Sequence, residues 1–210
     1  MKKSDSLRRR PWFREPSARF LIVCEGAVTE PHYFNELRRQ ERGVVEVKVV
    51  PGGVPKTVVE KAVRLKKESD SDADRRKDDN LRYDHVWCVF DIDEHPFVPE
   101  AKQQARNNAI EVAVSNPCFE LWLLLHFQEQ TAHIERDRVA RLCREHMPGY
   151  KKEPRCELLA PRQEEALARA AQLDAWQATR GNAGENPSMG VHRLVRQVRA
   201  VRQSPTTGTM

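Results

Sequence analysis

Acidic residues follow two apolar segments that have the composition of buried strands. RFLIVC is followed directly by Glu25 and Gly26, and HVWCVFD ends at Asp91, with Asp93 two positions further on. In an extended chain Asp91 and Asp93 point to the same side, about 7 Å apart. Carboxylate oxygens at this spacing suit a hard divalent cation, so we expect one or two Mg²⁺ or Mn²⁺ ions here. Gly26, without a Cβ, would let a phosphate or backbone come close.

The elements that must position these acids alternate between strand and helix. Apolar runs and alternating patterns predict strands at RFLIVC, VVEVKVV, HVWCVFD and AIEVAVS, each followed by a helical pattern. This order indicates an α/β fold with a mostly parallel central sheet and helices on both faces. The carboxyl ends of parallel strands meet at one edge of the sheet, where ligands bind. Several acids gathered there would repel one another unless a cation neutralised them.

A solvated acidic loop is the ordinary alternative for the segment DID. For Asp91 and Asp93 alone we would favour that loop, because acidic loops after strands are common. The Glu-Gly pair at the end of another strand shifts the balance toward a metal site.

The chain is divided into four segments by its patterns. We expect a basic flexible tail at 1–18, an α/β catalytic core at 19–133, a helical extension packed on the core at 134–203, and a disordered end at 204–210. Within the extension the patterns predict helices alone. The polar stretch ESDSDADRRKDDN has no periodicity, which predicts an exposed, mobile loop.

Composition limits the compartment and the partners. No apolar run approaches the roughly 18 residues of a membrane span, and the basic N-terminus lacks the apolar region of a signal peptide. We therefore expect a cytoplasmic protein without membrane contact. The five cysteines show no CxxC spacing, which predicts reduced core thiols in preference to metal ligands.

The net charge of +5 comes from the two ends of the chain. Residues 1–19 hold seven Lys and Arg against two acids, and residues 188–210 hold four arginines and no acid. The middle has 25 basic and 29 acidic side chains, which is net −4. This distribution suits a metal site flanked by polyanion-binding surfaces, and solvated tails would give the same distribution.

Five segments together resemble the RloB-like family: VCEGAVTEPHYF, WCVFDIDEH, AVSNPCFELWLLLHF, GYKK and NPSMGVHRLV. The resemblance spans about residues 19–200. It implies a Toprim-like fold, shared with topoisomerases, primases and the nucleases of the overcoming-lysogenization-defect family. In that superfamily a Glu after the first strand and a DxD after a later strand bind Mg²⁺ and act on phosphodiesters.

The resemblance also assigns site residues by position. Glu25 matches the first acid, and Asp91 and Asp93 match the DxD. The nuclease branch adds further acids, a Ser-containing segment and a late lysine. The candidates for these are Glu30, Ser115, Glu120, Lys151 and Lys152.

In phosphodiester hydrolysis these residues would have separate roles. A cation held by the DxD would polarise the phosphate and activate water, while Glu25 would ligate the cation or accept the proton of the water. Glu120 and Ser115 could supply ligands for a second ion. Lys151 or Lys152 would neutralise charge on the phosphate in the transition state.

Structural roles remain open for several of these candidates. Glu120 could cap or pair within its own helix, and Glu30 lies where a negative charge favours a helix start. Lys151 and Lys152 could be a solvated loop pair.

The leading hypothesis is a metal-dependent nuclease that cleaves RNA in preference to DNA, with tRNA as a candidate substrate. Its role as the toxic effector of anti-phage abortive infection, with an ATPase partner, is implied by the resemblance alone. The modest net charge predicts weak to moderate, salt-dependent substrate binding. The alternatives are a non-catalytic nucleic-acid or partner-binding subunit of such an ATPase complex, and a phosphatase of the haloacid-dehalogenase type. The phosphatase is disfavoured because its DxD normally follows the first strand.

Overall fold

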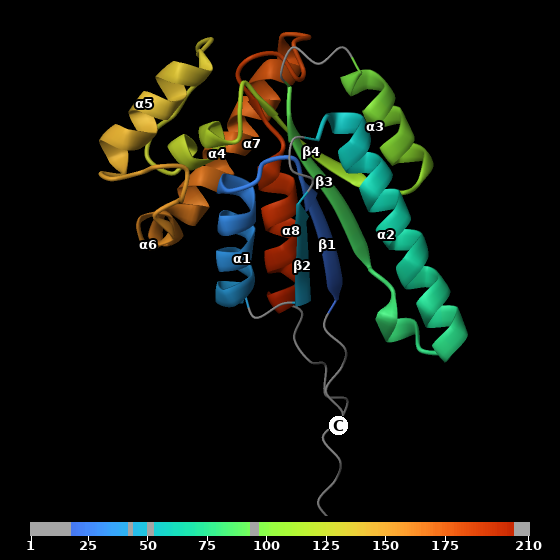
Figure 1. Cartoon of the computed structure of the whole chain (residues 1–210). Coiled ribbons are helices and arrows are strands. Elements are labelled where there is room, and N and C mark those ends of the chain that lie inside the picture. Colours follow the sequence, from blue (N-terminus) through green and yellow to red (C-terminus); the bar gives the residue numbers. More distant parts are fainter. Residues whose placement is uncertain (1–17, 42–43, 50–52, 93–96, 204–210) are drawn as a thin grey trace, which may run out of the picture.

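A five-stranded sheet forms the centre of the molecule (Figure 1). The computed structural model describes residues 18–41, 44–49, 53–92 and 97–203. In chain order the strands are β1 (Arg19–Cys24), β2 (Val44–Val49), β3 (His85–Asp91), β4 (Glu111–Asn116) and β5 (Ser188–Met189). The strand order is β2-β1-β3-β4-β5; the first four strands are parallel, and β5 pairs antiparallel with β4. The predicted α/β class with a mostly parallel sheet is therefore confirmed, and the architecture is consistent with a Toprim-like fold.

Helices cover both faces of the sheet (Figure 1). The larger helices are α1 (Thr29–Glu41), α2 (Pro55–Arg76), α3 (Val98–Asn107), α5 (Arg136–His146), α7 (Gln163–Thr179) and α8 (Val191–Gln203). Two short helices, α4 (Glu120–Leu125) and α6 (Cys156–Leu159), lie between them. Helices α2 and α3 pack on one face, while α1 and α8 pack on the other, with α4 to α7 beyond them.

The apolar run of β1 is explained by burial on both faces. Ile22 and Cys24 belong to the cluster under α1 and α8, and Leu21 and Val23 belong to the cluster under α2 and α3. A strand buried on both faces needs apolar residues at every position, which removes the usual alternation.

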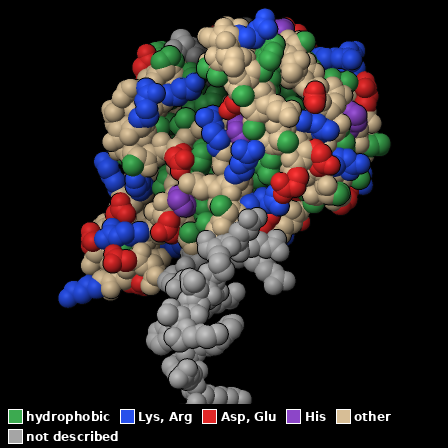
Figure 2. All heavy atoms as spheres, turned by 180° about the vertical axis from the view of Figure 1, so that it is seen from behind, with side chains coloured by type: hydrophobic (Ala, Val, Ile, Leu, Met, Phe, Trp, Pro, Cys, Tyr) green, Lys and Arg blue, Asp and Glu red, His purple; other side chains and the backbone are tan. Residues whose placement is uncertain are grey.

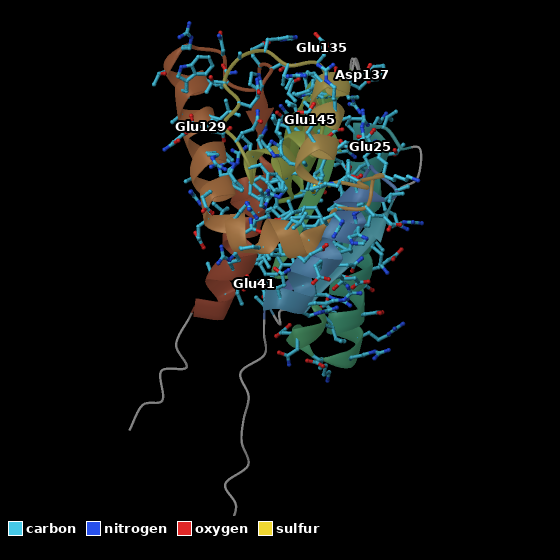
Figure 3. All side chains as sticks on the ribbon, turned by 90° about the vertical axis from the view of Figure 1, so that its left-hand side faces the viewer. Glu25, Glu41, Glu129, Glu135, Asp137 and Glu145 are labelled. Carbon is cyan, nitrogen blue, oxygen red and sulfur yellow. The ribbon has the colours of Figure 1, made fainter. Side chains whose placement is uncertain are left out.

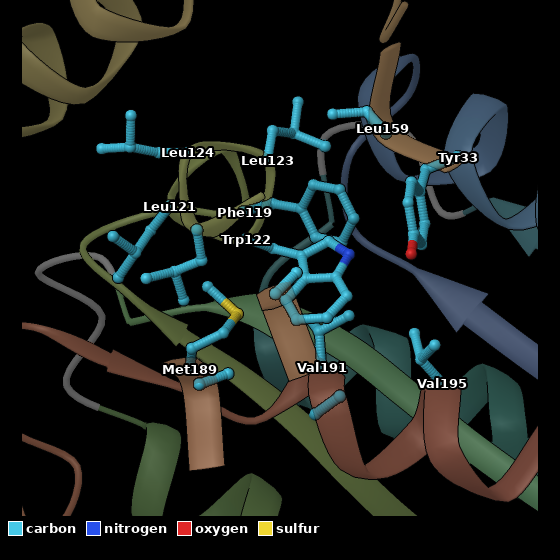
Figure 4. Packing of buried hydrophobic residues seen from close by; sticks show 14 of the residues in the cluster. Tyr33, Phe119, Leu121, Trp122, Leu123, Leu124, Leu159, Met189, Val191 and Val195 are labelled. Carbon is cyan, nitrogen blue, oxygen red and sulfur yellow. The ribbon is translucent and has the colours of Figure 1, made fainter. Parts of the chain in front are cut away.

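The C-terminal helices share the larger core cluster with the sheet. The ring of Trp122 lies edge-on to Tyr33, with centroids 6.2 Å apart, and Val191 and Val195 of α8 belong to the same cluster (Figure 4). This core holds α8 against the sheet, and β5 adds to the sheet edge. The segment after Ile134 is thus packed on the α/β part.

Residues 68–76 of the acidic stretch ESDSDADRRKDDN form the last turns of α2, so the expectation of a mobile loop is wrong. Helix α2 continues to Arg76 and ends at Lys77, which has a left-handed conformation with φ of 54°. The guanidinium of Arg82 donates to the carboxylates of Asp70, Asp74 and Asp79. This single cation offsets Asp70 and Asp74 on the last turns of the helix and Asp79 beyond it, an arrangement that hydrophobic periodicity does not reveal.

The expectation of helices alone after Ile134 is also wrong, because Ser188–Met189 forms β5. The strand is followed by Gly190, whose N–H donates to the carbonyl of Val114 at 2.8 Å. A Cβ at Gly190 would lie 2.9 Å from the Val114 nitrogen, so only glycine permits this close approach. A two-residue strand is too short to show a pattern in the sequence.

Several other expectations can be compared with the structure. All five cysteines are buried and none forms a disulfide, as predicted. Among the described helices, none has the length and apolar character to cross a membrane. The basic tail, apart from Ala18, and residues 204–210 lie outside the described residues.

Candidate functional site

A pocket of about 380 Å³ lies at the carboxyl end of the parallel strands. It is lined by side chains and backbone from the turn after β1, the start of α1, the end of β3 and the starts of α4 and α5. A loop residue between α5 and α6 also contributes. The lining residues are Glu25, Gly26, Ala27, Val28, Thr29, Glu30, Gly53, Asp91, Glu120, Arg136 and Lys152.

Glu25 and Asp91 meet in this pocket because β1 and β3 are parallel neighbours. The register pairs Cys24 with Val89, and the Glu25 N–H donates to the Val89 carbonyl at 3.0 Å. Glu25 therefore lies at the carboxyl end of the sheet, whereas Glu41, at the end of α1, lies at the opposite end (Figure 3). Asp93, the second acid of the DxD, lies outside the described residues.

The Asp91 carboxylate is buried and incompletely bonded. Among the described residues its Oδ1 has no hydrogen-bond partner, while its Oδ2 accepts from the Arg136 guanidinium at a long 3.4 Å. Burial raises the pKa of Asp91 well above its usual value, and the nearby carboxylates of Glu30, Glu120 and Glu25 add to this against the opposing effect of Arg136. An orphaned carboxylate oxygen in a pocket of acids is a place where a cation would be favoured.

Glu30 is buried in the pocket although it lies in the first turn of α1. It is 6% exposed. Burial raises its pKa, and the carboxylates of Glu120 and Glu25 raise it further, against hydrogen bonds from the backbone N–H groups of Glu30 and Gly26. An ordinary exposed charge at a helix start would not show this environment. Glu30 is therefore a potential ligand as well as a charge favourable to the helix dipole.

Gly26 gives the Glu30 carboxylate its space. A Cβ at position 26 would lie 2.0 Å from Glu30 Oε2. Any larger side chain at this position would force the Glu30 carboxylate out of its place.

We expect the substitution Gly26→Ala to destabilise the fold by about 1–2 kcal/mol through this overlap. Chemical denaturation measures the effect. The double variant Gly26→Ala/Glu30→Ala should recover most of the loss, because it removes the carboxylate that the new methyl group meets. A double variant as unstable as Gly26→Ala alone would show that the clash lies elsewhere.

Glu120 forms an ion pair with Lys152 across the pocket. Lys152 Nζ lies 3.1 Å from Glu120 Oε1, and the Tyr150 hydroxyl donates to the same oxygen at 3.4 Å. Burial acts to raise the pKa of Glu120, but the Lys152 charge and hydrogen bond outweigh it, so the pKa is lowered. The partner of Glu120 thus comes from a distant loop and not from its own helix. In return, the Glu120 charge raises the pKa of Lys152.

The loop that carries Lys152 is tied to the start of α1. The Thr29 hydroxyl donates to the Lys152 carbonyl at 2.9 Å. Lys152 has φ of 76°, a left-handed conformation that is uncommon for a residue with a side chain. Such a conformation persists where surrounding contacts fix it, and it occurs often at functional sites.

Two of the sequence candidates lie outside the pocket. Ser115 is fully buried, and its hydroxyl faces the Met189 sulfur at 3.8 Å. Lys151 is exposed and does not line the pocket, so the two adjacent lysines are not equivalent. The sequence could not separate them, because the left-handed turn at Lys152 decides which lysine faces inward.

The sequence did not point to Arg136, which lies at the start of α5. Its guanidinium donates to the carbonyl of Pro117 at 3.0 Å as well as to Asp91. Arg136 is 45 positions from Asp91 along the chain, and no local pattern marks it. It brings a second cation to the pocket beside Lys152.

The donors in the pocket match a hard cation in kind. In the part of the chain that the structure describes, four carboxylates line it, and the buried Asp91 Oδ1 has no hydrogen bond. Within the described ranges, however, no three His, Cys, Asp or Glu side chains are gathered closely enough to hold an ion. Lys152 and Arg136 are instead bonded to two of the four acids. Carboxylate oxygens are donors of the kind that Mg²⁺ prefers, and Glu25, Glu30, Asp91 and Glu120 are the described side chains that would hold such an ion.

Fold and pocket together define an α/β protein with an acidic site at the carboxyl end of a parallel sheet. The family model described as RloB-like protein matches residues 20–198, and the chain belongs to this family. Neither a curated protein nor a solved structure matches the chain.

Proposed function

We propose that this chain is a Mg²⁺-dependent or Mn²⁺-dependent nuclease that hydrolyses phosphodiester bonds, with RNA, tRNA included, preferred over DNA. The observation that carries the proposal is the convergence of Glu25, Glu30, Asp91 and Glu120 with two cationic side chains in one pocket. Acidic ligands for a divalent ion together with cations for a phosphate are the parts that phosphoryl chemistry requires.

The four acids would have different roles in the reaction. Asp91 and Glu25 would hold the cation at the strand ends, and Glu30 and Glu120 would complete its surroundings. The bound Mg²⁺ would polarise the scissile phosphate and lower the pKa of a water molecule. Glu25 or Glu30 could accept a proton from the attacking water, and the raised pKa of Glu30 suits a general base.

The cations would bind the substrate phosphate. The side chains of Lys152 and Arg136 are 68% and 44% exposed, while Glu120 and Asp91, to which they are bonded, are largely buried. Their charged groups can therefore reach an incoming phosphate from the pocket rim. Figure 2 shows acidic and basic side chains interspersed over the face that it displays, which suits modest, salt-dependent binding of a polyanion.

The resemblance to defence proteins extends the proposal to biological role and partners. We propose that the nuclease acts as the toxic effector of an anti-phage abortive-infection system and that an ATPase encoded nearby restrains or activates it. A cytoplasmic location follows from such a role.

The test is incubation of the purified chain with tRNA, other RNA, single-stranded DNA and double-stranded DNA. Each substrate is incubated with Mg²⁺, with Mn²⁺ and with EDTA, in parallel with the folded variant Asp91→Asn. We expect cleavage that needs the metal, is fastest on RNA, and is lost in the variant. Asp72→Asn, a half-exposed aspartate of α2 outside the pocket, is the matched control and should cleave like the unchanged protein.

A specific observation favours one alternative function. Among the described residues, Lys152 and Arg136 engage two of the acids and no ready cluster of three ligands exists. A non-catalytic nucleic-acid or partner-binding subunit would need no such cluster. Absence of cleavage even with the neighbouring ATPase present would replace the nuclease proposal with this one.

A further inference from the structure

A second pocket lies on the other side of the carboxyl end of β3. Its volume is about 590 Å³, within the roughly 300–1,000 Å³ of pockets that hold small ligands. Asp91 lines the acidic pocket, whereas the next residue, Ile92, lines this one. Successive side chains of an extended chain point to opposite faces, so the two pockets share one strand end without sharing a lining residue.

The second pocket combines an apolar floor with charged walls. Ile92, Val112 and Val114 form the apolar part, Lys102 comes from α3, and Arg193 comes from the first turn of α8. Asp174 of α7 is the acidic side chain among the lining residues. Two cations therefore face one carboxylate.

The Lys102 ammonium lies near the like charges of Arg106 and Arg193. No hydrogen bond or ion pair engages it within the part of the chain that the structure describes, whereas Asp174 lies 3.7 Å from His192 and 3.9 Å from Arg193. Burial lowers the pKa of Lys102, and the charges of Arg106 and Arg193 lower it further. Keeping an uncompensated cation in this position costs stability, which is typical of a group that serves a ligand.

The pocket walls are fixed before any ligand binds. The buried Gln177 side chain donates to the Pro187 carbonyl at 2.8 Å, and the Asn116 side chain donates to the Gly184 carbonyl at 2.9 Å. These bonds hold the segment between α7 and β5 that closes one side. A preformed wall lowers the entropic cost of binding.

We propose that this second pocket binds a nucleotide, with its phosphate between Lys102 and Arg193 and its ring against Ile92, Val112 and Val114. The two cations would bind the phosphate, and the aliphatic floor would contact the apolar ring. The pocket volume is large enough for a nucleotide. The positive end of α8, which begins beside the pocket at Val191, adds to the attraction for an anion.

The nucleotide could be free or part of a nucleic-acid strand whose scissile bond lies in the acidic pocket. The second case rests on the proposed nuclease function, and the first does not. Both sources share the same chemistry, so one set of binding measurements separates them.

The test is isothermal titration calorimetry of the full chain in EDTA, where no metal-dependent turnover occurs. The probes are inorganic phosphate, AMP and a short oligoribonucleotide. The variants are Lys102→Met and Arg193→Met, with Lys67→Met, an exposed lysine of α2 outside the pocket, as the control. Each pocket variant should weaken nucleotide binding at least ~10-fold, and Lys67→Met should leave it unchanged.

The pattern across probes identifies the source. AMP binding that Lys102→Met and Arg193→Met weaken indicates a free nucleotide, and the same effect with the oligoribonucleotide alone indicates a strand. The proposal is overturned if no probe binds, if the two variants bind as well as the unchanged protein, or if phosphate binds as tightly as AMP. Circular dichroism establishes that both variants are folded. Lys102 has no ion-pair partner among the described residues, so Lys102→Met should not lower the melting temperature.

Because the measurement excludes metal and turnover, its result is independent of the cleavage assay. A chain that cuts RNA but binds no nucleotide here would keep the nuclease proposal and lose this one. If the chain binds AMP here but cuts no substrate, the nucleotide proposal is kept and the nuclease proposal is lost.

Discussion

The substitution Asp91→Asn should reduce metal-dependent cleavage at least ~100-fold, because even residues that only support a metal ligand cost about 10–100-fold when changed. Asn keeps the size of the side chain and one oxygen, so the fold should be retained. The measurement is the initial rate on RNA at saturating Mg²⁺, and Asp72→Asn, outside the pocket, serves as the control. Unchanged cleavage in Asp91→Asn would remove Asp91 from the chemistry.

The same substitution should raise the free energy of unfolding at neutral pH without metal. The pKa of Asp91 is raised in the folded state, first by burial and then by Glu30. Above the unfolded pKa of about 3.9, the folded state holds the Asp91 proton more tightly than the unfolded state does. The free energy of unfolding therefore falls as the pH rises from this value toward the folded pKa. The gain in Asp91→Asn should therefore be present at pH 7 and disappear toward pH 4, as urea denaturation across this range would measure.

Added Mg²⁺ should make the unchanged protein more stable than Asp91→Asn. A ligand that binds the folded state alone stabilises it by about 2.7 kcal/mol at a concentration 100 times its Kd. The unchanged protein should gain this stability, and Asp91→Asn should gain much less. Equal effects of Mg²⁺ on both proteins would contradict a cation site at Asp91.

If the proposed nuclease function holds, Lys152→Met should reduce cleavage about 100-fold, because it removes the cation that would neutralise a phosphate in the transition state. It should also destabilise the protein at neutral pH, since Glu120 would remain buried beside other acids without its partner. Breaking a fully buried ion pair costs several kcal/mol, but Lys152 is largely exposed. We therefore expect the free energy of unfolding to fall by about 1 kcal/mol.

The pH dependence distinguishes this role from simple packing. In the unchanged protein the pKa of Glu120 is lowered because Lys152 outweighs burial. Its contribution to stability is therefore present above the unfolded pKa of about 4.3 and is lost as the pH falls through the lower folded value. In Lys152→Met burial dominates, the pKa of Glu120 rises, and the loss of stability should shrink toward pH 4.

Lys151→Met is the matched control for Lys152→Met. The two lysines are adjacent, but Lys151 is exposed and does not line the pocket. We expect its cleavage rate and pH profile to match those of the unchanged protein. Equal losses in both variants would indicate a general charge effect of the loop, and the specific pairing of Lys152 with Glu120 would then have no catalytic role.

The two errors in the predicted elements have a common physical cause. The last turns of α2 are mostly polar, and their acids Asp70 and Asp74 are offset by Arg82, which follows the helix. Strand β5 has two residues and exists because β4 offers it an edge. In both cases a partner outside the local segment decides the conformation, and local periodicity carries no information about that partner.

The sequence by itself determined the parallel α/β core and the place of Glu25 and Asp91. Burial on both faces forces a continuous apolar strand, and parallel strands bring their carboxyl ends to one edge. The tertiary structure alone decided that Lys152 and not Lys151 faces the pocket, that Arg136 joins Asp91, and that Ser115 faces Met189. These contacts link residues far apart in the chain, and their geometry depends on how the later helices pack on the sheet.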